Sequence, residues 1–120
     1  MQTIYADGGC RGNGISEGEM YGSWVRDVQK MEWREYGYGT NNRAEYLTLI
    51  DALKDAQAHG VDRVLVYMDS QLIVNQVNGE WKVKEAALLP LQLEARKLLF
   101  DLKGSLRWVR RDVIFEKLGH

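Results

Sequence analysis

The sequence lacks the features that mark secreted and membrane proteins. A single cysteine among 120 residues cannot form an internal disulfide, which indicates a reducing, cytoplasmic setting. No window approaches the roughly 18 apolar residues that a membrane-spanning helix needs. Residues 1–7 show no basic region followed by an apolar stretch, so we expect no secretory signal. The length fits one globular domain over residues 1–120.

Histidine and net charge are scarce as well. With only His59 and His120, the chain has no histidine beside Cys10 in the sequence, which disfavours cysteine- or serine-type catalysis. The formal net charge is -1 and the sequence pI is near 6.1, whereas a simple cationic nucleic-acid binder would have a pI above about 9. The net charge differs between the two parts of the chain. Residues 1–69 hold 7 basic and 11 acidic side chains, whereas residues 70–120 hold 9 basic and 6 acidic ones.

The hydrophobic pattern predicts a mixture of strands and helices. Eight of the twelve glycines fall between Gly8 and Gly39, which predicts a turn-rich first third. Strands are predicted at residues 2–7, 21–28, 31–38, 63–68 and 105–109, and helices from Asn42 to a stop at Gly60, at 70–77 and at 88–102. The strand at 63–68 is mostly apolar and β-branched, which is typical of a strand buried on both faces. This order predicts an α/β fold with a mixed sheet flanked by helices.

Three carboxylates stand where such a fold would gather them. Asp7 ends the first predicted strand, Asp69 ends the strand at 63–68, and Glu45 lies early in the helix between them. If the two strands are parallel neighbours, Asp7 and Asp69 emerge side by side, and the helix leans Glu45 over the same edge. Three like charges in one place call for a cation, and an oxygen-only cluster suits Mg²⁺ or Mn²⁺. The alternative is that these residues only begin turns or favour helix termini.

The sequence around each carboxylate is distinctive. The flanks are D-G-G-C-R-G-N-G from Asp7, T-N-N-R-A-E from Thr40 and Y-M-D-S-Q from Tyr67, followed by V-N-Q-V-N-G-E-W-K-V-K from Val74. In this order and at these spacings they resemble type 1 ribonuclease H, over roughly residues 2–111. The resemblance implies a ribonuclease H-like five-stranded mixed sheet and an endonuclease that hydrolyses the RNA strand of RNA/DNA hybrids. The chain resembles a compact member, without the basic insertion that some relatives carry.

The resemblance also implies the site. Asp7, Glu45 and Asp69 would bind two Mg²⁺ or Mn²⁺ ions, which about 3.5 to 4 Å apart can activate water, hold the scissile phosphate and stabilise the leaving oxygen. Substrate contacts would come from the glycine-rich segment, the flanks of the other carboxylates and a tryptophan that meets the DNA strand: Gly8, Gly9, Cys10, Arg11, Gly12, Asn13, Thr40, Asn41, Gln71 and Trp81. The alternatives are a plain hairpin connection for the glycines and core packing for Trp81.

Two departures from the family pattern bear on activity. The fourth carboxylate of the family, an Asp in a C-terminal helix, falls on Leu118, so we expect that helix to be missing or vestigial. Asp112 and Glu116 are the nearest substitutes. A weaker second metal site would lower activity or favour Mn²⁺ over Mg²⁺. In addition, Glu85 replaces the asparagine that in the family helps Thr40 to bind a DNA phosphate.

Loss of that helix would also expose apolar surface. Val113, Ile114 and Phe115 form an apolar run with no evident partner in the sequence. Exposed apolar patches often mark interfaces. We therefore expect a homodimer through the C-terminal tail.

Three other functions are alternatives to a ribonuclease. The first is a hybrid-binding module that has lost turnover with the missing Asp. A DNA-cleaving relative, such as a junction resolvase or a transposase-like domain, is disfavoured by T-N-N-R-A-E and by the short glycine segment. A phosphate or nucleotide binder built on Gly8 to Gly14 is disfavoured because the spacing is neither G-x-x-x-x-G-K-[ST] nor G-x-G-x-x-G.

Overall fold

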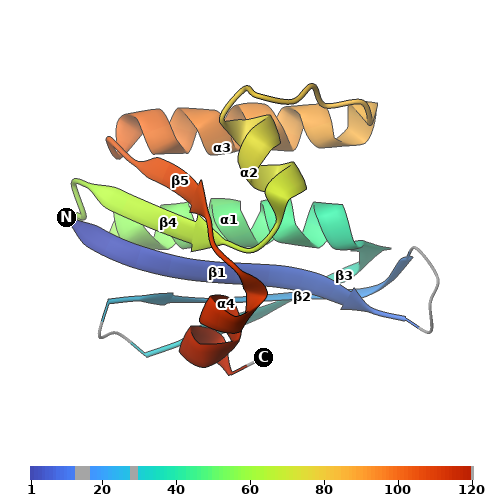
Figure 1. The fold of residues 1–120 in the computed structure, drawn as a ribbon, viewed down its shortest axis with the longest axis horizontal. Helices are drawn as coiled ribbons and strands as arrows, with labels where there is room; N and C mark the ends of the chain where they lie inside the picture. The colour runs from blue at the N-terminus through green and yellow to red at the C-terminus, as the bar shows by residue number, and fades with distance from the viewer. Residues whose placement is uncertain (13–16, 28–29, 120) are drawn as a thin grey trace.

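The computed structural model describes residues 1–12, 17–27 and 30–119, which form one mixed sheet with helices on both sides (Figure 1). The strands are β1 (Gln2–Arg11), β2 (Glu17–Arg26), β3 (Glu32–Thr40), β4 (Val64–Met68) and β5 (Ser105–Trp108). The helices are α1 (Asn41–Ala58), α2 (Gln71–Val77), α3 (Leu89–Asp101) and α4 (Arg111–Leu118), with a 3-10 turn at Ala86–Leu88 before α3. The predicted α/β class and the five strands are confirmed. Asn13 lies outside the described residues.

The sheet has the strand order β3-β2-β1-β4-β5. The first three strands pair antiparallel as a meander, whereas β4 pairs parallel with both β1 and β5. A parallel pair needs a long crossover connection, and α1 supplies it between β3 and β4. The predicted parallel neighbours, β1 and β4, are therefore adjacent at the centre of the sheet.

The core lies between the sheet and α1. Ile4 and Ala6 of β1 and Val66 of β4 point to this side and have no exposed surface, as do Leu49 and Leu53 of α1. Helix α3 packs against α1, and α2 contacts both α3 and β5 (Figure 1). None of the helices among the described residues has the length and hydropathy that a bilayer crossing demands.

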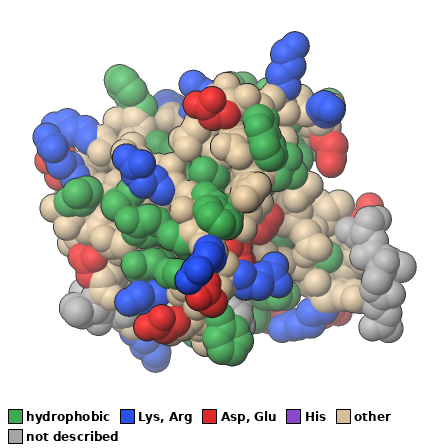
Figure 2. Space-filling model, viewed as in Figure 1, with side chains coloured by type: hydrophobic (Ala, Val, Ile, Leu, Met, Phe, Trp, Pro, Cys, Tyr) green, Lys and Arg blue, Asp and Glu red, His purple; other side chains and the backbone are tan. Residues whose placement is uncertain are grey.

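The opposite face of the sheet is only partly covered. Helix α4 lies on this face and contacts β1 and β2 (Figure 1). Tyr5, Leu65 and Tyr67 are half-buried here, and Figure 2 shows hydrophobic side chains at the surface beside Lys and Arg. The prediction that β4 is buried on both faces is therefore wrong, because α4 is too short to cover it.

The C-terminal helix is short rather than missing. It spans eight residues and ends at Gly119, which takes the left-handed conformation with φ 79°. Ile114 is fully buried and Leu118 is 5% exposed, so these two side chains anchor α4 on the sheet. The apolar run thus has a partner at Ile114, while Phe115 remains 60% exposed.

Candidate active site

Asp7 and Asp69 lie side by side where β4 ends. Pairing between β1 and β4 stops at Tyr5 and Tyr67, two residues before each carboxylate. The prediction that Asp7 ends the first strand is wrong, because β1 continues to Arg11 by pairing with β2. Asp7 nevertheless lies beside Asp69 as predicted, because at Asp7 the strand β1 extends beyond the end of its parallel neighbour β4.

Glu45 reaches the same place because α1 approaches β1 closely. Thr40 caps the helix, and its Oγ1 accepts a hydrogen bond of 3.1 Å from the Arg43 backbone N–H. A Cβ added to Gly8 would lie 2.6 Å from the Ala44 carbonyl oxygen, so only glycine allows this approach. The glycine next to Asp7 therefore sets the position of the helix turn that carries Glu45.

The three carboxylates form one cluster. An oxygen of each lies within 4.8 Å of the others. Burial, followed by the charge of Asp69 and a hydrogen bond with it, raises the pKa of Asp7 to about 7. Burial, followed by the charges of Asp7 and Asp69, raises the pKa of Glu45 to about 8. Protons are retained because burial, and then the mutual repulsion of the carboxylates, disfavours the charged forms, and a bound cation would offset both effects.

Arg111 is a residue of the site that the sequence reasoning missed. Its Nε lies 3.5 Å from Asp69 Oδ2, and its charge lowers the pKa values of Asp7 and Glu45 against the larger effects that raise them. The sequence signal for it is the V-R-R segment, Val109 to Arg111, which follows the last strand.

The donor set fits a hard divalent cation. Three carboxylates supply oxygen ligands only, which Mg²⁺ and Mn²⁺ prefer. Among the described residues, neither Asp112 nor Glu116 joins the cluster. Asp112 instead pairs with Arg110 at 3.1 Å, and the side chain at the expected fourth position, Leu118, is buried. The cluster therefore has three carboxylates rather than four.

The glycine-rich segment is part of the strand and not a loop, at least as far as Arg11. The Cys10 backbone N–H donates a 2.8 Å hydrogen bond to Asn41 Oδ1, which ties this segment to the start of α1 beside the cluster. Arg11, also predicted to contact substrate, lies 3.5 Å from a carboxylate oxygen of Glu35 and 5.4 Å from the ring centroid of Tyr21. Gly12 follows the strand and is exposed.

Trp81 borders a groove of about 540 Å³ after α2. The groove is also lined by Leu72, Gln76, Glu80, Lys82, Lys84, Glu85 and Leu88. Trp81 is 47% exposed, which favours a contact surface over the alternative of core packing. Gln71, the first residue of α2, is exposed as well. Glu85 adds a negative charge to this groove.

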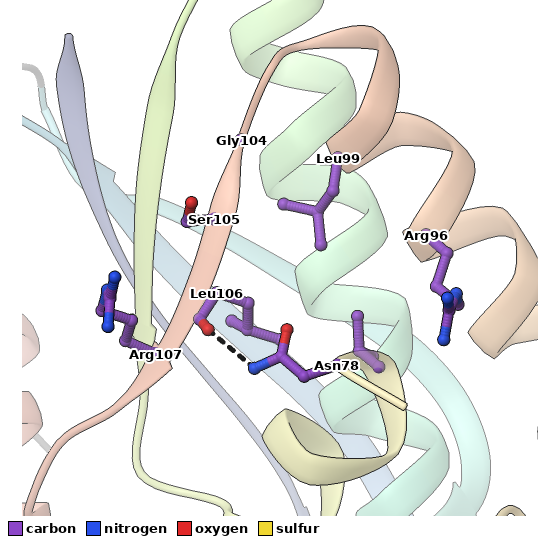
Figure 3. Close-up of a pocket in the computed structure, with 8 residues that line it drawn as sticks. Asn78, Arg96, Leu99, Gly104, Ser105, Leu106 and Arg107 are labelled. Atoms are coloured by element: carbon purple, nitrogen blue, oxygen red, sulfur yellow. Dashed lines mark hydrogen bonds between the residues drawn. The ribbon is translucent and has the colours of Figure 1, made fainter. Parts of the chain in front are cut away.

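A polar pocket of about 400 Å³ lies elsewhere, along β5 between the end of α2 and α3 (Figure 3). Asn78 Nδ2 donates a 2.9 Å hydrogen bond to the Leu106 carbonyl there, which satisfies a backbone acceptor on the edge strand β5. Arg96 and Arg107 lie on opposite sides of β5 in Figure 3. These cations do not converge, and none of the three clustered carboxylates lines the pocket.

The fold and the cluster together define the class of protein. The structure superposes with a TM-score of 0.88 on RNase H1 from Halobacterium salinarum, at 31% identity over 97% of this chain and 89% of that one. It is also similar, with a TM-score of 0.86, to LC11-RNase H1 in complex with an RNA/DNA hybrid, at 30% identity over 98% of this chain and 91% of that one. The fold is therefore that of type 1 ribonucleases H.

Sequence comparison agrees. Residues 29–114 match the family model described as "Reverse transcriptase-like". The chain is 36% identical to a ribonuclease H of Chlorobium phaeobacteroides, over 83% of this chain and 73% of that protein. It is 41% identical to the bifunctional protein Rv2228c of Mycobacterium tuberculosis over 91% of its length, but it spans only 31% of that protein. The chain belongs to the ribonuclease H family, which confirms the resemblance seen in the sequence.

Proposed function

We propose that the protein is an endonuclease that hydrolyses the RNA strand of RNA/DNA hybrids. The single observation that carries this function is the cluster of Asp7, Glu45 and Asp69 at the end of β4. A fold that a hybrid-bound RNase H1 shares supports the choice of substrate. We place the activity in the cytoplasm, as the single free cysteine suggests.

In this proposal the three carboxylates hold two divalent ions, Mg²⁺ or Mn²⁺. When bound, such ions supply an activated water and charge stabilisation at the scissile phosphate. The task of the protein is to preorganise the ligands. Asp7 is fixed within a paired strand and Glu45 by the close approach of α1. Asp69 is fixed through its backbone carbonyl, which accepts a 3.1 Å hydrogen bond from the Trp108 Nε1–H.

Recognition of RNA would come from the surface beside the cluster. Gly12 is exposed, so its backbone can approach a sugar, whereas Gly8 and Gly9 pack against Ala44 and Tyr21. Asn41 and Gln71 would add contacts from the starts of α1 and α2. The 2′-hydroxyl is the group that distinguishes RNA from DNA.

The DNA strand would contact the groove at Trp81. The exposed ring offers a stacking surface, and Lys82 and Lys84 offer phosphate contacts. Glu85 in this groove would repel a phosphate, so the affinity for the DNA strand would be modest and sensitive to salt.

The test is cleavage of RNA/DNA, RNA/RNA and DNA/DNA duplexes by the protein and by its Asp7→Asn variant. Cleavage restricted to the hybrid and lost in the variant is the expected result. Equal cleavage by the variant would contradict the assigned site, and cleavage of DNA duplexes would identify a DNA nuclease instead.

A second candidate is a hybrid-binding module without turnover. The burial of Leu118 at the expected fourth position, with Asp112 and Glu116 outside the cluster, favours it. This candidate predicts hybrid binding without cleavage in either metal. The nuclease proposal instead expects faster cleavage in Mn²⁺ than in Mg²⁺, and equal, vigorous rates in both would contradict a weakened second metal site.

We also propose that two chains pair through α4. Phe115 is 60% exposed on this helix, beside a sheet face that α4 leaves partly open. Sedimentation velocity over a range of concentrations tests the pairing. A dimer that Phe115→Ser dissociates is the expected result, and a monomer at every concentration would contradict it.

A further inference from the structure

A guanidinium lies against the most deeply buried carboxylate that forms an ion pair among the described residues. The Asp69 side chain is 6% exposed, whereas the Arg111 side chain is 90% exposed. Arg111 Nε lies 3.5 Å from Asp69 Oδ2. Arg111 therefore reaches in from solvent, and a side chain this exposed can leave Asp69 without disturbing the core.

The placement of Arg111 follows from the sheet. Met68 pairs with Trp108, and the Val109 backbone N–H donates a 2.9 Å hydrogen bond to the Met68 carbonyl. The chain then crosses in front of β1 and starts α4 at Arg111 (Figure 1). The end of β5 is thus fixed to the end of β4, directly beside Asp69, and the first residue of α4, Arg111, is placed there.

A divalent ion and this guanidinium would compete for Asp69. Mg²⁺ sits about 2.1 Å from its oxygen ligands, so an ion on Oδ2 would lie no more than about 5.6 Å from Arg111 Nε where it now stands. Two cations at that separation repel each other. When all three carboxylates are deprotonated, they and the one guanidinium leave two negative charges, which a single divalent ion neutralises.

We propose that Arg111 is an intramolecular cation that competes with a divalent ion at Asp69 and so weakens the binding of an ion there. This inference rests on the proposed metal-dependent function and adds a residue, Arg111, that sets the affinity of the site at Asp69. An ion would bind tightly at Asp69 when Arg111 leaves it, for example when a phosphate draws the guanidinium away.

The test is a Mn²⁺ titration without nucleic acid, in which electron paramagnetic resonance measures the free ion. Arg111→Gln should bind Mn²⁺ roughly tenfold more tightly than wild type, the effect of a unit charge about 5 Å from a divalent ion in a water-like dielectric. Arg111→Lys keeps the charge and should resemble wild type. Arg110→Gln, which removes the neighbouring arginine outside the cluster, should also leave binding unchanged.

Circular dichroism verifies that each variant is folded, as expected for a side chain that is 90% exposed. Identical Mn²⁺ binding by wild type and Arg111→Gln would overturn the competition. Tightening in Arg111→Lys as large as in Arg111→Gln would overturn it too, because charge would not be the cause. Absence of Mn²⁺ binding in every variant would contradict the metal-dependent function as well, which separates the two failures.

Discussion

Glu45→Gln should stabilise the metal-free protein at alkaline pH, although it removes a residue that we assign to catalysis. The pKa of Glu45 is raised to about 8 from an ordinary value of 4.5, first by burial and then by the charges of Asp7 and Asp69. Ionising this carboxyl at pH 8 therefore costs the folded chain up to about 4 kcal/mol relative to the unfolded chain. Glutamine has nearly the same shape and carries no charge.

The expected gain in the free energy of unfolding is smaller than the full cost of ionising Glu45. Part of the pKa shift is shared with Asp7, whose own pKa is raised to about 7, and the glutamine amide loses the favourable hydrogen bond between the carboxylate and Ser70. We expect Glu45→Gln to raise the free energy of unfolding by about 1–3 kcal/mol at pH 8.

The pH dependence has a definite sign. A carboxyl with a raised pKa in the folded state imposes no cost below its unfolded pKa, and the cost grows as pH rises from about 4.5 to about 8. The stability difference between variant and wild type should therefore shrink below about 1 kcal/mol at pH 5. Saturating Mg²⁺ should narrow or reverse this stability difference at pH 8, because the wild type binds the ion more tightly than Glu45→Gln and is therefore stabilised more.

Urea unfolding followed by circular dichroism, in chelator at pH 5 and pH 8, measures these differences. Glu116→Gln is the matched control, since Glu116 is exposed and outside the cluster, and it should leave stability unchanged. A Glu45→Gln protein that is less stable than wild type at pH 8, or a gain equal at both pH values, would refute the electrostatic reasoning.

Three further changes test other parts of the structure. Gly8→Ala should cost about 1–3 kcal/mol of stability and slow cleavage, because its Cβ meets the Ala44 carbonyl; unchanged stability and rate would contradict this. Ile114→Ala should cost about 2–4 kcal/mol in urea unfolding, since this side chain of α4 is fully buried against the sheet, and a loss well under 1 kcal/mol would show that α4 is not anchored there. Trp81→Ala should raise the KM for hybrid by about fivefold or more with little change in kcat, whereas Phe100→Ala, on an exposed face of α3, should change neither.

Much of the site could be predicted from sequence because it depends on element order. Parallel pairing of β1 with β4 follows from the strand, helix, strand succession, and that pairing brings Asp7 and Asp69 together. Glu45 follows once the intervening helix packs on the same strands.

The errors have a common cause in long-range pairing. Whether β1 stops at Asp7 depends on how far its hydrogen bonds with β2 continue, and local glycines do not decide this. Likewise, Arg111 becomes a partner of Asp69 only through the register of β5 on β4. The partial exposure of Leu65 and Tyr67 depends on the length of α4, which cannot be predicted from the β-branched, apolar sequence of β4 itself.

Hydrolysis of an RNA/DNA hybrid labelled on its RNA strand, in Mn²⁺, by wild type and by Asp7→Asn, tests the central claim most directly. The account predicts internal cleavage of the RNA strand by wild type and a rate at least about 100-fold lower for the variant, since a ligand of the metal cluster is lost. Binding of the hybrid without cleavage, or cleavage that survives the substitution, would contradict the account.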